Sequence, residues 1–375
     1  MTTTQHADVV VIGAGIVGMA VARAAAQRGQ QVVLFERSER QLGASIRNFG
    51  LVWPVGQPAG ALYNRALRSR TIWLDMAQRA GIWQREAGSL HLAYAQDELD
   101  VLEEYLATTP VAREHGGLLT PPEVTRRSHA VNHDGLRGAL WSDSELNVDP
   151  REAIRAIPAV LERDFGVTLR FGTLVHGIAA PLVQTVSETW HAERIFVCSG
   201  PDFETLYPQE FAASGILRCK LQMLRTVPQP GGWQLGPALC AGLTLLHYSA
   251  FAHCTSLAAL RARFAATHPF QRAEHIHVLL SQTRFGELTI GDHHEYGLTV
   301  EPFDRAEVDD AILAYLCSFA AVPTLQIAER WHGVYPWLKG QTELVLQPAA
   351  GVTIVNGLGG AGMTLAFGLA EEIVG

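Results

Sequence analysis

The chain has 375 residues, enough for about two domains, and 48% of them are hydrophobic while 18% are charged. The formal net charge is −8 and no long basic block occurs, so nucleic acid is not expected as a partner. The sequence has two lysines, Lys220 and Lys339, and this scarcity disfavours chemistry through a lysine Schiff base.

The cysteines and the N-terminal segment bear on the cellular compartment. The five cysteines are too widely spaced for a CxxC metal or redox motif: Cys198, Cys219, Cys240, Cys254 and Cys317. The first residues, MTTTQHAD, contain neither a basic region nor a long apolar region, and no apolar run reaches the roughly 20 residues of a membrane helix. We therefore expect reduced thiols, a cytoplasmic location and no membrane span.

The N-terminal segment has the pattern of a βαβ unit. Residues 7–15 begin with a β-branched run that is typical of a strand buried in a parallel sheet, and 16–29 carries the small residues of a tightly packed helix. Residues 31–37 form a second predicted strand. Between the first strand and the helix, 13–18 reads GAGIVG and matches the GxGxxG pattern.

This glycine-rich turn predicts an ADP-binding site. Glycines allow a tight turn and a close approach of the backbone to a pyrophosphate, and the helix N-terminus offers unpaired N–H groups. Glu36 ends the second strand, where its carboxylate can accept hydrogen bonds from ribose hydroxyls and would repel a 2′-phosphate. The turn alone leaves NAD and FAD open, and a purely structural turn is the alternative.

Two further stretches favour FAD. Residues 43–52, GASIRNFGLV, follow the βαβ unit; Ser45 could donate to the pyrophosphate, and Arg47 and Asn48 could line the ribityl chain and the ring. Residues 356–364, NGLGGAGMT, form a second glycine-rich loop before a helix, and its backbone N–H groups would stabilise negative charge on a reduced flavin. For either stretch alone, a surface loop or plain packing is the alternative.

The rest of the chain alternates between helical and extended patterns. In chain order the segments are mostly helix (60–110), helix followed by strands (146–178), an apolar strand (194–200), a mixed or antiparallel sheet (206–300), a helix (307–322), and a final strand, loop and helix (352–375).

The predicted fold is α/β, or α+β overall, with a Rossmann-like FAD-binding domain interleaved with a substrate-binding domain on a mixed, largely antiparallel sheet. We expect the FAD-binding domain to comprise 1–80, 140–205 and 325–375. The substrate-binding domain then comprises 81–139 and 206–324.

Taken together, these motifs resemble a known family. VVVIGAGIVG, the Glu36-Arg37 strand end, GASIRNFG, VCSG at 197–200 and GLGGAGMT are similar to FAD-dependent oxidoreductases of the D-amino-acid oxidase, glycine oxidase and sarcosine oxidase type. More narrowly, GASIRNFGLVWPVGQ, GDHHEYG and ERWHGVYP resemble a bacterial clade of this family that is associated with aminophosphonate catabolism.

The resemblance implies a reaction class. Such enzymes oxidise a C–N bond by hydride transfer to flavin N5, and the imine then hydrolyses to an aldehyde or keto acid. No general base is obligatory, so no catalytic residue is assigned. Residues 331–340 lack the cysteine that attaches flavin in some relatives, so noncovalent FAD is expected. Sarcosine-oxidase-like relatives carry a lysine that is credited with oxygen activation, and Thr289 stands at that position here. They carry a second lysine that holds the substrate carboxylate, and the corresponding loop here, 360–364, contains no lysine.

The residues expected to contact FAD come from these motifs. They are Gly13, Ala14, Gly15, Ile16, Val17, Gly18, Glu36, Arg37, Gly43, Ala44, Ser45, Arg47, Asn48, Phe49, Val175, Ser199, Gly200, Gly357, Leu358, Gly359, Gly360, Ala361, Gly362, Met363 and Thr364.

The expected substrate is a small anionic amine, most specifically an aminophosphonate such as the N-methyl or 1-hydroxy form of 2-aminoethylphosphonate. A phosphonate dianion prefers several converging N–H and O–H donors. The candidate contacts are Arg47, Gln222, Tyr248, His253, His293, His294, Arg330, Tyr335 and Thr364. For each of them an ordinary structural role is the alternative. His275 and His277 alternate as on a strand, and the adjacent histidines in 292–295 diverge, so no metal site is predicted.

Three other functions stay open. The substrate could be glycine, sarcosine or a D-amino acid; the chain could be a dinucleotide-binding module without redox turnover; or it could be a nicotinamide dehydrogenase. Oxygen or another acceptor is expected to reoxidise the flavin, and the oligomeric state is not predicted.

Overall fold

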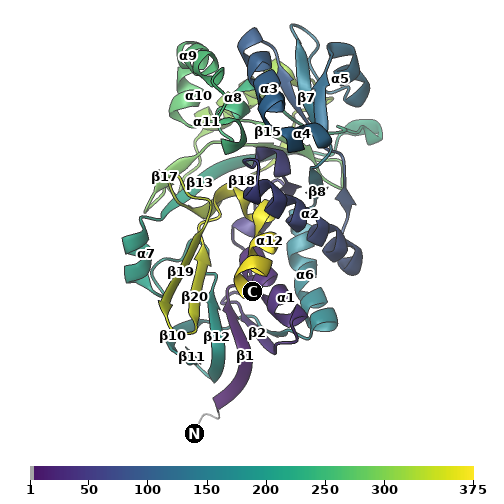
Figure 1. The fold of residues 1–375 in the computed structure, drawn as a ribbon. Helices are drawn as coiled ribbons and strands as arrows, with labels where there is room; N and C mark the ends of the chain where they lie inside the picture. Colours follow the sequence, from purple (N-terminus) through teal and green to yellow (C-terminus); the bar gives the residue numbers. More distant parts are fainter. Residues whose placement is uncertain (1–3) are drawn as a thin grey trace.

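The computed structural model describes residues 4–375, and the end of the molecule that contains the N-terminal βαβ unit is built on a parallel core of strands (Figure 1). Within the described chain, this first sheet has eight strands in the order β10-β11-β12-β1-β2-β9, with β20 beside β12 and β19 beside β20. The strands are β1 (Thr4–Ile12), β2 (Val32–Phe35), β9 (Thr168–Arg170), β10 (Val175–Ala179), β11 (Leu182–Thr185), β12 (Thr189–Val197), β19 (Leu344–Ala349) and β20 (Val352–Asn356).

The parallel pairing confirms the pattern read from the first 37 residues. β1 pairs in parallel with both β2 and β12, and β12 pairs in parallel with β20. Val9, Val10 and Val11 are fully buried, as expected for a β-branched run with a layer packed on each side.

Four helices form a layer beside this sheet (Figure 1). They are α1 (Ile16–Gln27), α2 (Ala61–Ala80), α6 (Pro150–Phe165) and α12 (Gly362–Val374). α1 packs against both α6 and α12, and its buried alanines, among them Ala20 and Ala24, allow the close approach. The first and last helices of the chain are therefore neighbours.

The opposite end of the molecule is built on a second, larger sheet. In residues 4–375 it has nine strands in the order β17-β13-β16-β15-β14-β5-β7-β6, with β18 beside β13. The strands are β5 (Ser89–Ala93), β6 (Gly116–Leu119), β7 (Gly138–Ser142), β13 (Leu217–Thr226), β14 (Ala238–Cys240), β15 (Leu279–Gln282), β16 (Leu288–Gly291), β17 (Glu295–Gly297) and β18 (Ile327–Trp337). β14 and β5 run parallel and the other pairs are antiparallel, so the predicted mixed, largely antiparallel sheet is confirmed.

Most of the remaining helices belong to this end (Figure 1). They are α3 (Gln96–Thr108), α4 (Pro110–Glu114), α5 (Pro121–Arg127), α8 (Gly242–Leu245), α9 (Leu257–Thr267), α10 (Pro269–Ala273) and α11 (Ala306–Phe319). The helix α7 (Pro208–Ser214) instead packs on the first sheet, where Phe211 joins the core around Val10 and Ile12. A short sheet of β3 (Leu51–Val52), β8 (Leu146–Val148) and β4 (Gln84–Arg85) joins segments of both halves.

Two strands of the larger sheet extend into segments that were expected in the FAD-binding domain: the end of β7, which reaches Ser142, and β18. β18 lies in the segment 325–375 that was expected in the FAD-binding domain, yet it pairs with β13 along most of its length in the larger sheet. The chain enters the smaller sheet again only at β19. The crossing strand matters for the site, because it carries Tyr335 and because Arg47 hydrogen-bonds to its backbone at His332.

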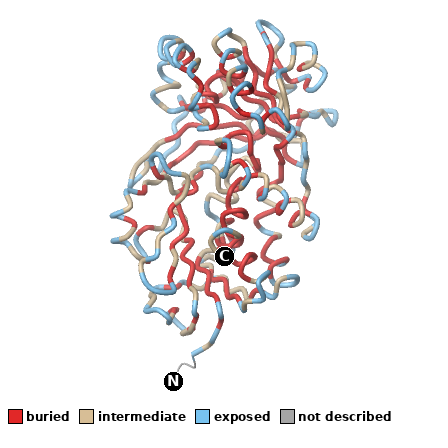
Figure 2. The backbone as a smooth tube through the Cα atoms, viewed as in Figure 1, coloured by how far each residue is buried: buried red, intermediate tan, exposed pale blue. Residues whose placement is uncertain are grey.

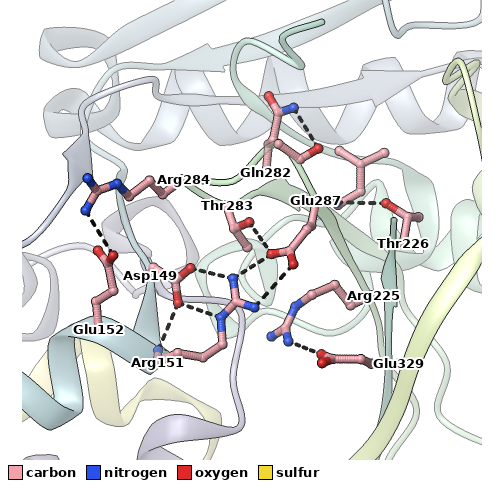
Figure 3. A network of polar contacts seen from close by, with 12 residues as sticks. Asp149, Arg151, Glu152, Arg225, Thr226, Gln282, Thr283, Arg284, Glu287 and Glu329 are labelled. Carbon is pink, nitrogen blue, oxygen red and sulfur yellow. Dashed lines mark hydrogen bonds and ion pairs between the residues drawn. The ribbon is translucent and has the colours of Figure 1, made fainter. Parts of the chain in front are cut away.

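An ion-pair network joins the two ends of the molecule (Figure 3). Asp149 is fully buried, caps the N-terminus of α6, and lies 2.7 Å from the guanidinium of Arg151. Arg151 also pairs at 2.5 Å with Glu287, in the turn between β15 and β16, and Thr283 donates to the same carboxylate at 2.8 Å. The network therefore ties the helix layer of the first sheet to a hairpin of the second.

Burial follows both sheets and the helix layer, while the exposed residues gather in the outer loops (Figure 2). Cys198, Cys219, Cys240 and Cys254 are buried free thiols, and Cys317 on α11 is exposed. None of the helices in residues 4–375 combines the length and the apolarity that a bilayer crossing requires.

Candidate active site

The turn between β1 and α1 is built by backbone packing that excludes side chains. Gly13 has φ of 101°, and a Cβ added there would lie 2.3 Å from the carbonyl oxygen of Cys198. A Cβ on Gly18 would lie 1.8 Å from the carbonyl oxygen of Gly13. Neither distance is sterically possible, so both positions require glycine for the strand, turn and helix to pack as they do.

Glu36 closes this turn from the second strand. One of its carboxylate oxygens accepts a hydrogen bond from the N–H of Ala14 at 3.0 Å, and the other accepts from the N–H of Ser38 at 3.0 Å. Arg37 points elsewhere and pairs with Asp202 at 2.7 Å on the surface. The carboxylate thus lies at the end of β2 beside the glycine-rich turn, and its contact with a ribose stays a prediction.

The segment 43–50 lies against the start of α1. Ser45 sits in a 3₁₀ turn (Ala44–Ile46), and its hydroxyl accepts from the N–H of Ile16 at 2.9 Å. Asn48 uses its side chain to hold its own turn, because its amide donates to the carbonyl of Ser45 at 2.7 Å and its oxygen accepts from the N–H of Gly50 at 2.7 Å. Asn48 is therefore a determinant of loop shape.

Arg47 links this segment to β18. Its guanidinium donates to the carbonyl of His332 at 3.1 Å, and its own carbonyl accepts from the indole N–H of Trp331 at 3.0 Å. The crossing strand and the segment 43–50 are thereby held together.

The second glycine-rich turn meets the first. β20 is followed by a 3₁₀ turn (Gly359–Ala361), and α12 begins at Gly362. A Cβ on Gly362 would lie 3.6 Å from the side chain of Ile16, and one on Gly360 would lie 3.4 Å from the hydroxyl of Tyr335. Two turns more than 340 residues apart therefore face the same space, which agrees with the expectation that they act together.

That space is a cavity of about 710 Å³ that runs from the glycine turns to the larger sheet. Thirteen of the residues expected to bind FAD line it: Ile16, Ala44, Ser45, Arg47, Asn48, Phe49, Leu358, Gly359, Gly360, Ala361, Gly362, Met363 and Thr364. The other expected FAD residues surround the first turn or nearby strand ends: Gly13, Ala14, Gly15, Val17, Gly18, Glu36, Arg37, Gly43, Val175, Ser199, Gly200 and Gly357.

Five of the nine candidate substrate contacts line the cavity: Arg47, Tyr248, His294, Tyr335 and Thr364. Thr364 has a structural partner as well, since its hydroxyl accepts from the N–H of Trp53 at 2.9 Å.

The other four candidates lie outside the cavity lining, have partners of their own in the structure, and stay predictions as substrate contacts. Gln222 donates to Asp309 at 2.7 Å, and Arg330 pairs with the same carboxylate at 3.1 Å. His293 accepts from the N–H of Gln222 at 2.9 Å, and His253 lies 2.8 Å from the hydroxyl of Thr108. Gln222 and His293 are buried partners within the sheet, whereas His253 and Arg330 lie at the surface.

The sequence reasoning missed several polar groups of the cavity: Arg272, His247, His275, His277, Asp292 and Tyr296. His277 was interpreted as a position on a sheet face, and that face turns out to be a cavity wall. His293 and His294 do diverge, as the alternation predicted. The signal that could have been used is the alternation itself, because it places His277, Asp292 and His294 on one side of two neighbouring strands.

Burial sets the charge of these groups. It lowers the pKa of His294 to about 4, and it holds the pKa of His247 and His277 well below the ordinary value. Burial raises the pKa of Asp292 well above the usual range of a carboxyl. At neutral pH the imidazoles of His277 and His294 and the carboxyl of Asp292 are therefore uncharged, and Arg47 and Arg272 supply positive charge in the cavity.

Sequence comparison places the chain among known proteins. The profile of one family, described as "DAO: FAD dependent oxidoreductase", matches residues 8–375. The chain is 28% identical over 224 residues to a subunit of the opine oxidase of Rhizobium meliloti, and 25% identical over 209 residues to glycine oxidase of Geobacillus kaustophilus. The first alignment covers 56% of each protein; the second covers 52% of this chain and 55% of the relative. The chain thus spans little more than half the length of the curated relatives it matches.

Solved structures have the same fold over nearly the whole chain. Glycine oxidase from Geobacillus kaustophilus aligns with a TM-score of 0.77 and 20% identity, covering 99% of this chain and 94% of that one. Iminodiacetate oxidase from Chelativorans sp. BNC1 aligns with a TM-score of 0.71 and 20% identity, covering 98% and 95%. The match of the family profile to all but the first seven residues shows that the chain belongs to the DAO family of FAD-dependent oxidoreductases.

Proposed function

We propose that the protein is an FAD-dependent amine oxidoreductase whose substrate is a small amine with an anionic end, specifically an aminophosphonate such as the N-methyl or 1-hydroxy form of 2-aminoethylphosphonate. One observation carries the proposal. A single cavity brings together both glycine-rich turns, two arginines and several imidazoles, which is a donor-rich lining for an anionic group next to a cofactor site.

The residues at the cofactor end fit FAD. Gly13 and Gly18 leave room for no side chain, the carboxylate of Glu36 stands at the end of β2, and the second glycine-rich turn leads into the N-terminus of α12 at Gly362. When bound there, FAD supplies the acceptor of a hydride. The cavity lining within residues 4–375 contains no cysteine, which supports the expectation that FAD is held noncovalently.

The chain's own contribution is to bind, orient and keep water from the reacting carbon. Arg272 and Arg47 would attract the anionic end, while Trp53, Leu243 and Leu279 supply apolar walls. Oxidation removes a hydride from the carbon that bears the amine and a proton from its nitrogen, and a C=N bond forms. Water then adds to the imine and releases an aldehyde together with ammonia or methylamine. None of these steps requires a strong base.

A second candidate is oxidation of an amino acid. The relatives that the chain resembles are named as a subunit of opine oxidase, glycine oxidase and iminodiacetate oxidase, and these names favour carboxylate amines. Glycine, sarcosine and D-amino acids are therefore the substrates against which the proposal is tested. A binding module without turnover and a nicotinamide dehydrogenase are the remaining alternatives.

The test is anaerobic reduction of the bound flavin by a panel of amines. The purified holoprotein is mixed with 2-aminoethylphosphonate, its N-methyl and 1-hydroxy forms, glycine, sarcosine and D-alanine, and loss of the visible flavin absorbance is followed. The proposal expects an aminophosphonate to react fastest and to give an aldehyde that mass spectrometry identifies. Faster reduction by a carboxylate amine would favour the second candidate, and a flavoprotein that no amine reduces would favour the binding module.

A further inference from the structure

Gly56 lies in the cavity wall at a position where the backbone does not require a glycine. It is buried, ends the 3₁₀ turn Pro54–Gly56 between β3 and α2, and lines the cavity. It is not one of the glycines with a positive φ, so a residue with a side chain could adopt its backbone conformation. Space, and not backbone conformation, is what a side chain at this position would lack.

Two aromatic rings occupy that space. A Cβ added to Gly56 would lie 2.7 Å from Cδ1 of Trp53, and 2.7 and 2.9 Å from Cδ1 and Cε1 of Tyr248. Carbon atoms in van der Waals contact are about 3.5–4.0 Å apart, so an alanine here would overlap with both rings. The rings of Trp53 and Tyr248, whose centroids are 6.3 Å apart, therefore pack directly on the backbone of Gly56.

The turn and Trp53 form the fixed side of this contact. The backbone N–H of Trp53 donates to the hydroxyl of Thr364 on α12 at 2.9 Å, and the N–H of Val55 donates to the buried carboxyl group of Glu145 at 3.1 Å. The indole of Trp53 is buried and packs beside His91, with ring centroids 5.6 Å apart. The turn is thus anchored both to the start of α12 and to the segment before β8.

Tyr248 is held differently, because its backbone is fixed by hydrogen bonds and its ring by packing. Its N–H donates to the carbonyl of Thr244 at 3.3 Å, and its carbonyl accepts from the N–H of Phe251 at 3.2 Å. Its ring meets the imidazoles of His247 and His277 edge to face, with centroids 5.0 and 5.6 Å apart. The ring of Tyr248 is therefore the group that a side chain at position 56 would displace.

The position of this ring bears on the space that a substrate can use. Thirteen of the residues expected to contact FAD line the same cavity of about 710 Å³, so a substrate would have only part of it. That part is bounded by side chains of the larger sheet and the segments around it, among them Leu243, Tyr248 and Leu279. Protein interiors are close-packed, so a ring wedged between a turn and two imidazoles does not readily give way to an additional carbon atom.

We propose that Gly56 is a positioning residue: it seats the ring of Tyr248 as a fixed wall of the cavity, and this wall limits the substrate to an amine with a short, unbranched carbon chain. The inference rests on the proposed function for the reaction and extends it to the size of the substrate. The limit comes from the ring of Tyr248 and not from its hydroxyl, so it applies to phosphonates and carboxylates alike.

The experiment measures binding of ligands without an amine to the holoprotein. Calorimetry compares ethylphosphonate with butylphosphonate, and propionate with pentanoate. In the unaltered protein the Kd should rise by roughly tenfold or more from the short to the long member of each pair, because the extra methylene groups meet the wall. Burial of apolar surface alone would lower the Kd instead. Since no ligand carries an amine, the result stands whether or not any amine reduces the flavin.

Two variants of Tyr248 separate the ring from the hydroxyl. Tyr248→Ala removes the wall, and the ratio of the long-ligand Kd to the short-ligand Kd should fall by roughly tenfold. Tyr248→Phe is the matched control, since it removes only the hydroxyl and should keep the ratio of the unaltered protein. Equal ratios in the two variants would mean that the ring does not set the size limit.

Gly56→Ala tests the positioning role. It should displace the ring and weaken binding of the short ligands by roughly 10- to 100-fold, as expected for a misplaced contact group. In the Tyr248→Ala background the indole of Trp53 gains room to turn aside, so the same substitution should cost no more than about a fifth as much. Gly117→Ala on β6 is the control, because its added carbon meets nothing within 4 Å and its φ is not positive. It should leave every Kd unchanged.

Four results would overturn the inference. The first is an equal Kd for the short and long ligands in the unaltered protein, and the second is failure of all four ligands to bind. The third is a Tyr248→Phe variant that accepts the long ligands as Tyr248→Ala does. The fourth is a Gly56→Ala variant that binds like the unaltered protein. If Gly56→Ala alone does not fold, recovery of a folded protein in the double variant with Tyr248→Ala supports the contact, and failure of both overturns it.

Discussion

The two ends of the cavity recognise their ligands by different means. At the cofactor end the surface consists largely of backbone, and Gly13 and Gly18 are in contact with carbonyl oxygens where a single added carbon has no room. At the substrate end the surface includes many ionisable side chains near strand ends; burial holds His277 and Asp292 neutral, and Arg272 carries positive charge. Substitutions that add an atom at Gly13 or Gly18 should therefore abolish cofactor binding. Substitutions at the substrate end should leave the fold intact, and those that change its charge should alter substrate binding.

The largest effect is expected at the cofactor end. Gly13→Ala adds a carbon 2.3 Å from the carbonyl of Cys198, so the turn must open and the purified protein should lack FAD. Gly29→Ala is the matched control, because Gly29 also has a positive φ, 78°, but its added carbon meets nothing within 4 Å. That control should cost only about 1–2 kcal/mol of stability and keep FAD. Flavin content measured by absorbance compares the two; FAD retained by Gly13→Ala would mean that the turn is not packed as described.

At the substrate end, removal of one charge should act on binding and not on folding. Arg272→Gln should raise the KM for the anionic amine by roughly 10- to 100-fold, as expected when a hydrogen bond to a charged group is lost. The melting temperature should change little, because Arg272 is only half-buried. Arg155→Gln on the exposed side of α6, away from the cavity lining, is the control and should leave KM unchanged. Equal KM values for both variants would exclude a role of Arg272 in charge recognition.

The ion-pair network of Asp149, Arg151 and Glu287 joins the two ends of the molecule, so its disruption should lower the stability of the whole protein. Glu287→Gln weakens the contact with Arg151 and leaves the buried carboxylate of Asp149 as the main partner of that guanidinium. We expect the free energy of unfolding to fall by about 2 kcal/mol, measured by urea denaturation. Glu152→Gln removes a more exposed pair with Arg284 and should cost less than about 1 kcal/mol. Similar losses would show that the network does not join the two ends.

The smallest predicted effect is the response of stability to pH at the substrate end. The folded protein lowers the pKa of His294 from 6.5 to about 4, so the unfolded chain binds a proton between these values that the folded protein does not. Stability therefore falls as pH drops below 6.5 and is fully present above it. Between pH 7.5 and 5.5 the unaltered protein should lose about 1.4 kcal/mol more than His294→Gln. If the free energy of unfolding falls equally for the two proteins between pH 7.5 and 5.5, the neutral charge state of His294 is contradicted.

These two ends also differ in how far they could be predicted. The GxGxxG turn, the Glu36 strand end and the second glycine turn are local patterns, and each element was found where the sequence placed it. The parallel and mixed sheets followed from strand patterns in the same way.

The substrate end depends on which strands become neighbours. Gln222 and His293 were predicted to face the substrate, but they hydrogen-bond to each other between paired strands. His247 and His277 are 30 residues apart, and their contact arises only because β15, β16 and the segment after α8 converge. The segment that contains β18 was expected in the FAD-binding domain, and the pairing of β18 with β13 could not be foreseen because it spans about 110 residues of chain.

The cysteines of this protein have a practical consequence. Four of the thiols are buried and Cys317, near the end of α11, is exposed and belongs to neither glycine turn nor the cavity lining. A maleimide dye applied to the native protein should therefore react with Cys317 alone. The four buried thiols should react only when the protein unfolds. Cys317 thus provides a single site for attaching the native protein to a surface. The labelling of the other four cysteines measures the fraction of molecules that are unfolded.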